Sequence, residues 1–130
     1  MQWSASVLFR FDKHDAANMR PFSVVQLEAL VRSVQREGLV IDAVKLSGHA
    51  DRLNGTGHDD YNQRLSEQRV ATVKAALVAL GLDPQRISTA ARGDAQPVQA
   101  CAQRFSAVAE LQECLLPNRR VEVLIEARRP

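Results

Sequence analysis

The stretch GHADRLNGTGHDDYN at residues 48–62 concentrates side chains that could do chemistry, with two histidines and three aspartates between glycines. Imidazole and carboxylate groups are common ligands of catalytic zinc or manganese. A metal-dependent hydrolase that uses His49, Asp51 and His58 is therefore one hypothesis. The spacing weakens it, because a Gly-Thr-Gly segment separates His58 from the other two and Asp60 suits the N-cap of a following helix. We therefore expect no metal site and no cofactor.

The elements that must position these residues follow from hydrophobic periodicity. Alternating apolar residues predict strands, with Val7, Val44, Leu46, Val121, Val123 and Ile125 inward, at residues 6–12, 39–50, 86–93 and 119–127. Spacing of three and four predicts helices from Ser23 to Gly38 and from Asp60 to Gly81, with N-caps at Ser23 and Asp60, and a weaker helix over 103–115. This alternation predicts one α/β (α+β) domain over residues 1–130, a two-layer sandwich in the order βαβαβ(α)β.

The inward stripe of the second predicted helix contains one charge. At 100° per residue the apolar members of the stripe are Leu65, Val73, Ala76, Leu77 and Leu80. Arg69 falls within the stripe, and Asn62 lies on it at the start of the helix. An unpaired guanidinium is too costly to bury, so Arg69 must meet an anion. Asp51, at the exit of the preceding strand, is the nearest carboxylate by topology, and we expect Asp51 and Arg69 to converge at one end of the sandwich.

This charge pair has two interpretations that the spacing leaves open. In the first, Asp51 and Arg69 form a salt bridge that fixes the loop to the helix, and the domain is a protein-interaction module. In the second, the pair binds a zwitterion: Asp51 contacts an ammonium, Arg69 a carboxylate, and Asn62 serves either group. Neither serine nor cysteine chemistry has support, because Ser47 and Ser66 lack a G-x-S-x-G context. A binding module is the favoured class, and we expect no enzyme activity.

The composition of the chain indicates which classes of partner the domain is not expected to bind. The 17 Lys and Arg residues against 15 Asp and Glu give a net charge of only +2, with both signs interleaved, so we expect no nucleic-acid partner. No segment is apolar for the roughly 18 residues that a membrane span needs. The N-terminal residues do not form a signal peptide. Cys101 and Cys114 lack zinc spacing, and the sequence alone leaves buried thiols and a disulfide equally open.

Several motifs of this sequence carry a resemblance to a known family. They are LSGHADRLNGTGHDDYNQRLSEQRVATVKAAL, ISTAARGDAQPV, CLLPNRRVEVLIE and the opening VLFRFD. Together they resemble the OmpA-like peptidoglycan-binding domain, whose pattern is G-H-[TSA]-D at a strand exit, then Y-N-x-x-L-S-x-x-R-A, and N-R-R-V-E at the last strand. The resemblance covers nearly the whole chain. It implies a four-stranded mixed sheet with the helices packed on one face.

The resemblance also implies a ligand and its contacts. The ligand is peptidoglycan, recognised through the meso-diaminopimelate of its stem peptide, whose free end carries an ammonium and a carboxylate. The family's ligand aspartate and arginine fall on Asp51 and Arg69, the same pair that the helix stripe indicates. The remaining implied contacts are Asn62, Leu65, Asp12 and Ala50. Ala50 replaces a Thr or Ser of many members, and the loop before the second helix is a few residues longer than usual, so the resemblance assigns no role to His58 or Asp59.

The family resemblance sets expectations for the cellular context. The cysteine pair is similar to that of outer-membrane porin-type members, which implies a Cys101–Cys114 disulfide formed in the periplasm. It implies that the chain is a fragment of a longer Gram-negative outer-membrane protein with an N-terminal membrane barrel. The function implied is to anchor the outer membrane to the cell wall, and a homodimer is compatible with it.

Overall fold

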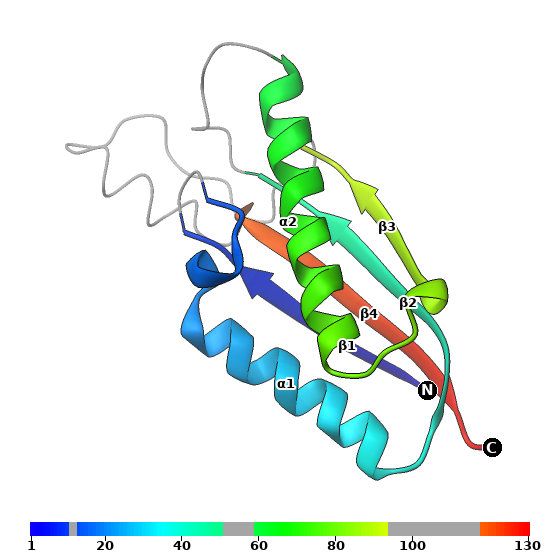
Figure 1. Ribbon diagram of the computed structural model, residues 1–130. Helices are drawn as coiled ribbons and strands as arrows, with labels where there is room; N and C mark the ends of the chain where they lie inside the picture. The colour runs from blue at the N-terminus through cyan, green and yellow to red at the C-terminus, as the bar shows by residue number, and fades with distance from the viewer. Residues whose placement is uncertain (11–12, 51–58, 94–117) are drawn as a thin grey trace.

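Four strands form one mixed sheet in the order β1-β4-β2-β3, as a computed structural model shows (Figure 1). The structure describes residues 1–10, 13–50, 59–93 and 118–130, and for residues 59 and 60 the backbone only. The elements are β1 (Gln2–Leu8), α1 (Pro21–Arg36), β2 (Val40–Gly48), α2 (Asp59–Ala79), β3 (Ile87–Ala91) and β4 (Arg120–Arg128), with 3-10 turns at Ala16–Asn18 and Pro84–Arg86. Over the described residues the element order agrees with the predicted one.

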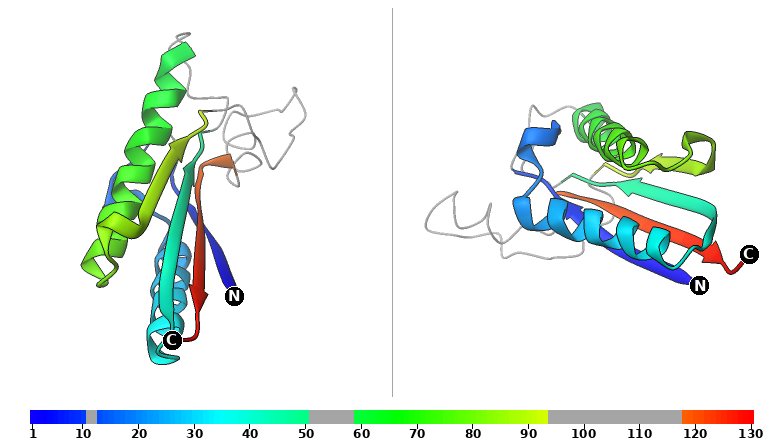
Figure 2. Two further views of the ribbon diagram at one scale, coloured as in Figure 1. Left: turned by 90° about the vertical axis from the view of Figure 1, so that its right-hand side faces the viewer. Right: turned by 60° about the horizontal axis from the view of Figure 1, so that its bottom comes forward.

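The pairing of the strands confirms the expected mixed sheet. β4 is antiparallel to both of its neighbours, β1 and β2, whereas β2 and β3 run parallel. Both helices cover the same face of the sheet, α1 beside β1 and α2 across β2, β3 and β4 (Figure 2). The predicted two-layer α+β sandwich is therefore confirmed.

The core lies between the helices and the sheet. Six strand residues predicted to point inward are at most 1 % exposed: Val7, Val44, Leu46, Val121, Val123 and Ile125. Leu27, Val31 and Val34 of α1 and Leu65, Val73 and Leu77 of α2 complete the layer, each at most 4 % exposed. Removing these side chains from water is the main favourable contribution to folding.

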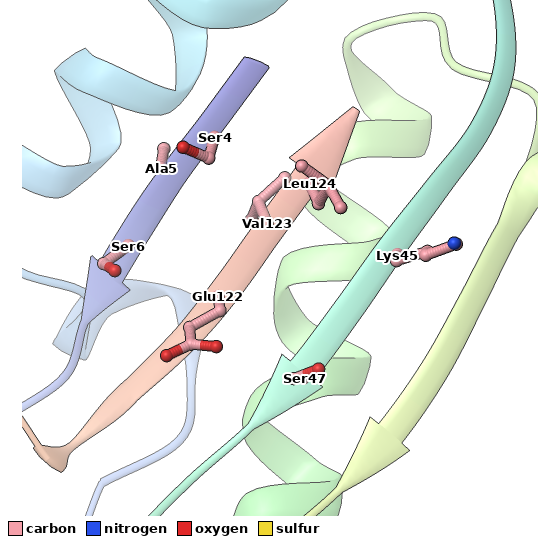
Figure 3. Close-up of a pocket in the computed structure, with 8 residues that line it drawn as sticks. All are labelled: Ser4, Ala5, Ser6, Lys45, Ser47, Glu122, Val123 and Leu124. Carbon is pink, nitrogen blue, oxygen red and sulfur yellow. The ribbon is translucent and has the colours of Figure 1, made fainter. Parts of the chain in front are cut away.

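The opposite face of the sheet carries mostly polar side chains. Ser6, Glu122 and Ser47 lie side by side on β1, β4 and β2, as do Ser4, Leu124 and Lys45 one pair further along (Figure 3). These residues line a shallow pocket of about 630 Å³. A sheet with one buried and one polar face explains the clear alternation in the sequence.

The first strand and the start of α1 differ from the prediction. β1 spans Gln2–Leu8 instead of residues 6–12, and Phe9 forms only an isolated bridge with Met19. Ser23 is not the N-cap, because α1 already begins at Pro21, whose ring fixes φ at a helical value. The Ser23 hydroxyl faces the sheet instead and accepts a hydrogen bond of 3.0 Å from the Leu8 N–H.

The helix ends are predicted better than the helix starts. Gly38 and Gly81 follow the two helices with φ of 65° and 103°, as their predicted C-terminal positions require. α2 begins at Asp59, so Asp60 lies inside the first turn and the predicted N-cap at Asp60 is wrong by one residue or more. The predicted helix over 103–115 lies outside the described residues. Within the described part of the chain, neither helix is apolar and long enough to cross a bilayer.

Candidate functional site

Arg69 is completely buried on the inward face of α2, as its helical position predicts. Its Nε donates a hydrogen bond of 2.9 Å to the Lys13 carbonyl, and its Nη1 donates one of 2.9 Å to the His49 carbonyl. The guanidinium carbon lies 5.5 Å from the centroid of the Phe9 ring. Two carbonyl dipoles and the negative face of an aromatic ring therefore stabilise the buried cation. The sequence predicts that this charge is buried but not that backbone carbonyls hold it.

A close approach between β2 and α2 brings Arg69 to the end of β2. A Cβ atom at Gly48 would collide with the Ser66 carbonyl and with the Val70 side chain, so only glycine allows α2 to lie this close to the end of β2. Gly48 continues the alternation of Val44 and Leu46 on β2, which places it on the face that the helices cover. The need for glycine follows only from the tertiary contact.

Ser66 and Gln63 attach the first turns of α2 to the exit of β3. The Ser66 hydroxyl donates to the Gln63 carbonyl at 2.8 Å and accepts from the Gly93 N–H at 3.1 Å. The Gln63 amide donates to the Ala91 carbonyl at 2.9 Å. The sequence patterns did not identify either residue as one that positions α2. The signal that could have found Ser66 is its place beside Leu65 on the buried side of the helix.

Three of the other predicted ligand contacts, Leu65, Ala50 and Asn62, are among the described residues. Leu65 and Ala50 are 4 % and 3 % exposed, and the Ala50 N–H donates to the Gly93 carbonyl at 2.8 Å. Asn62 is half-buried in the first turn of α2, with its side-chain oxygen buried. Asp12 and Asp51 lie outside the described residues, as do Cys101 and Cys114.

Arg69 nevertheless contacts the chain close to both predicted carboxylates. Lys13, whose carbonyl accepts from Nε, directly follows Asp12 in the sequence. His49, whose carbonyl accepts from Nη1, precedes Asp51 by two residues. Described residues that are close in sequence to both predicted carboxylates therefore lie beside the guanidinium.

His49 is also buried, at 1 % exposure, but its ring nitrogen Nε2 lies 3.8 Å from Glu122, which is on the face of the sheet opposite to α2 (Figure 3). Burial, aided by the positive charges of Arg120 and Arg92, lowers the pKa of His49 to about 4, although Glu122 at 3.8 Å opposes the shift. The imidazole is therefore neutral at pH 7. The described residues contain no group of three metal-type side chains, while Asp51 and His58 of the hydrolase hypothesis lie outside them.

The motif Asn118-Arg119-Arg120 is buried before and at the start of β4, each residue at most 3 % exposed. Arg119 Nε donates to the Phe9 carbonyl at 3.0 Å, and the Phe9 N–H donates to the Arg119 carbonyl at 2.8 Å. Arg120 Nε pairs with Glu122 at 2.8 Å. The motif thus holds Phe9, the ring that faces the Arg69 guanidinium.

Solved structures share this architecture. The peptidoglycan-associated lipoprotein from Burkholderia pseudomallei superimposes with a TM-score of 0.68 at 20% identity, over 93% of this chain and 89% of that one. The OmpA-like domain of FopA1 from Francisella tularensis gives 0.66 at 22% identity, over 98% and 76%. The cell wall anchor of the T6SS from Pseudomonas aeruginosa gives 0.65 at 23% identity, over 98% and 82%. The class of fold is that of the OmpA-like domains.

Sequence comparison shows the family itself. Residues 9–110 match the OmpA family, and the chain belongs to that family. It is 32% identical to outer membrane protein A of Shimwellia blattae over 123 residues, which is 94% of this chain and 48% of the relative. The same protein from Klebsiella pneumoniae is also 32% identical, and 34% of its length is covered. The chain thus spans half or less of the length of these relatives.

Proposed function

We propose that this domain binds peptidoglycan non-covalently and anchors the outer membrane to the cell wall, without catalysing a reaction. Membership of the OmpA family supports the proposal, as do the names of two proteins with the same fold, a peptidoglycan-associated lipoprotein and a cell wall anchor. The observation that carries it is the buried cation of Arg69 at the end of the sheet. An arginine cannot lose its proton in a protein, so this position keeps a positive charge for an anionic ligand.

The proposed ligand group is meso-diaminopimelate, whose free end is a zwitterion. Arg69 contacts its carboxylate and Asp51 its ammonium, while the Asn62 amide serves either group. Arginine has five N–H donors, so the same guanidinium can hold two backbone carbonyls and also contact a carboxylate. Leu65 and Ala50 provide apolar contacts for the methylene chain, and Asp12 is a second candidate for the ammonium.

Substitution of the charge pair tests this site. We expect Asp51→Ala and Arg69→Ala to abolish the co-sedimentation of the domain with purified peptidoglycan, because each removes one half of the zwitterion contact. Arg32→Ala, which removes an exposed cation from α1, is the control and retains binding. Circular dichroism verifies that each variant is folded. Retained binding in both site variants would show that the charge pair is structural.

Ligand titration separates the proposal from its alternatives. Calorimetry with meso-diaminopimelate shows saturable binding, whereas lysine, which lacks the second carboxylate, binds much more weakly. A domain that binds only a protein partner shows no heat with either compound. The hydrolase hypothesis of His49, Asp51 and His58 requires bound zinc or manganese, which elemental analysis of the purified protein detects.

The cellular context is part of the same proposal. We place the domain in the periplasm, as one part of a longer chain that is embedded in the outer membrane by an N-terminal barrel, with a Cys101–Cys114 disulfide and a homodimer as further properties. Alkylation of the native and of the reduced protein, followed by mass spectrometry, distinguishes the disulfide from two thiols. Closing a loop of this length by a disulfide stabilises a domain by about 3 kcal/mol.

A further inference from the structure

A groove lies beside the first turns of α2, next to the Arg69 site. It has a volume of about 380 Å³ and is lined by His14, Tyr61, Arg64, Leu65 and Gln68. It continues from the Arg69 site at two points. Leu65 is also one of the proposed ligand contacts of the Arg69 site, and His14 directly follows Lys13, whose carbonyl accepts from Arg69 Nε.

Hydrogen bonds hold the two walls of this groove together. Thr72 Oγ1 donates to the His14 carbonyl at 2.5 Å, one turn beyond Gln68 on the same helix. Together with the bond from Arg69 to Lys13, it ties the segment after β1 to α2. The groove is therefore a fixed feature between two attached segments.

The polar side chains of the groove suit an acidic group. Arg64 is exposed on α2, and Gln68 is exposed four residues later, which places both on the same side of the helix. A guanidinium and an amide offer several N–H donors to one carboxylate. The half-buried Tyr61 adds a flat apolar surface at the same end.

We propose that this groove binds the D-glutamate residue that precedes diaminopimelate in the stem peptide, and that Arg64, assisted by Gln68, contacts its α-carboxylate. The inference rests on the proposed function, because it takes Arg69 to hold the diaminopimelate. D-Glutamate is joined to diaminopimelate through its side-chain carboxyl group, so its α-carboxylate is free. The free carboxylate of D-glutamate is separated from the zwitterion at Arg69 by the length of the diaminopimelate chain, and Arg64 lies five residues before Arg69 on α2, an axial distance of about 7.5 Å. Arg64 is then the residue that distinguishes acidic stem peptides from amidated ones.

The test uses two synthetic tripeptides, L-Ala-γ-D-Glu-meso-diaminopimelate and its analogue with D-isoglutamine, which differ only in that carboxylate. We expect the unaltered domain to bind the acid about fivefold more tightly than the amide, the effect of one partly exposed charge pair. In Arg64→Ala the ratio falls to about one, and in Arg64→Glu it inverts. Arg64→Lys keeps part of the preference, and Arg32→Ala on α1 keeps all of it.

The outcomes separate this inference from the proposed function. If free meso-diaminopimelate binds but the acid-to-amide ratio is the same in Arg64→Ala as in the unaltered domain, the groove assignment is wrong and the proposed function stands. If neither free diaminopimelate nor either tripeptide binds, both are wrong. A ratio near one in the unaltered domain also overturns the role of Arg64.

Discussion

Arg69 and His49 lie on opposite sides of the end of β2. Both are buried, but Arg69 keeps its charge whereas His49 loses it. Arg69, on the side of α2, stays charged and is held by two backbone carbonyls and the Phe9 ring. His49, on the other side, is equally buried, and its pKa is lowered to about 4, so it is neutral at pH 7. The two side chains are connected, because the His49 carbonyl is one of the acceptors of Arg69.

This contrast shows which buried basic group can still pair with an anionic ligand. A histidine in a poorly hydrated position releases its proton, and with it the ability to pair with an anion. An arginine cannot do so, and the fold must supply acceptors for it instead. A fixed positive charge at the end of this sheet therefore depends on α2 and on the two carbonyls, and each of the following experiments changes one part of this arrangement.

The largest effect is expected for Arg69→Lys. The ammonium keeps the charge but lacks the planar fork that reaches two carbonyls, so one buried acceptor loses its donor. We expect the free energy of unfolding, measured with urea, to fall by about 3 kcal/mol. A loss below about 1 kcal/mol would mean that the two carbonyls do not depend on the planar fork of the guanidinium.

The pH dependence of stability tests the lowered pKa of His49, on the other side of β2. Because the folded-state pKa of His49 is about 4 and the unfolded one is near 6.5, the unfolded chain binds more protons between these values. The contribution of His49 to the free energy of unfolding is therefore complete above pH 6.5 and is lost as the pH falls toward 4. We expect a loss of about 2 kcal/mol between pH 6.5 and 4.5 that is absent in His49→Gln. His14→Gln is the control, and an unchanged slope in His49→Gln would contradict the assignment.

A smaller effect is expected for Ser66→Ala, which loosens α2 from the exit of β3. The Gly93 N–H loses its acceptor, so the domain should be destabilised by about 1 kcal/mol. The exchange rate of the Gly93 amide, followed by NMR, should rise at the same time. Ser33→Ala on the exposed side of α1 serves as the control and should change stability by about 0.5 kcal/mol at most. A protected Gly93 amide in Ser66→Ala would exclude this role of the hydroxyl.

The smallest effect concerns charges that remain in water. Lys45 and Glu126 form a 3.0 Å pair on the polar face of the sheet, with side chains 57% and 33% exposed. Exposed pairs contribute little, so Lys45→Ala should change the midpoint of urea unfolding by an amount equivalent to about 0.5 kcal/mol or less. A loss comparable to that of Arg69→Lys would show that the contrast between buried and exposed charges is wrong.

The sequence predicted the fold class and the burial of Arg69 because both follow from periodicity. The alternation of strand residues and the 100° spacing of Leu65, Arg69 and Val73 need no knowledge of the other elements. The start of β1 was missed because Ser4, Ala5 and Ser6 are small and give a weak alternation. The N-cap at Ser23 was wrong because Pro21 starts the helix two residues earlier.

The supporting contacts of the site could not be predicted from local patterns. The acceptors of Arg69 are backbone carbonyls, and every residue type offers one, so nothing in the sequence marks Lys13 or His49 as a partner. Likewise, Gly48 could be assigned to the inner face, but the Ser66 carbonyl that excludes a Cβ there comes from another element. The roles of Asp12 and Asp51 stay predictions.

The position of β4 has a consequence for how the chain acquires this structure. β1 pairs only with β4, and Gln2 lies opposite Glu126, so the first strand has no neighbour in the sheet until the last described strand has been produced. β4 must also enter between β1 and β2. Such long-range pairing slows folding, because a large loop has to close before any contact compensates for it. The sheet is therefore expected to form only after Arg120–Arg128 has been synthesised, and a truncation before Arg120 should leave the Arg69 site unformed.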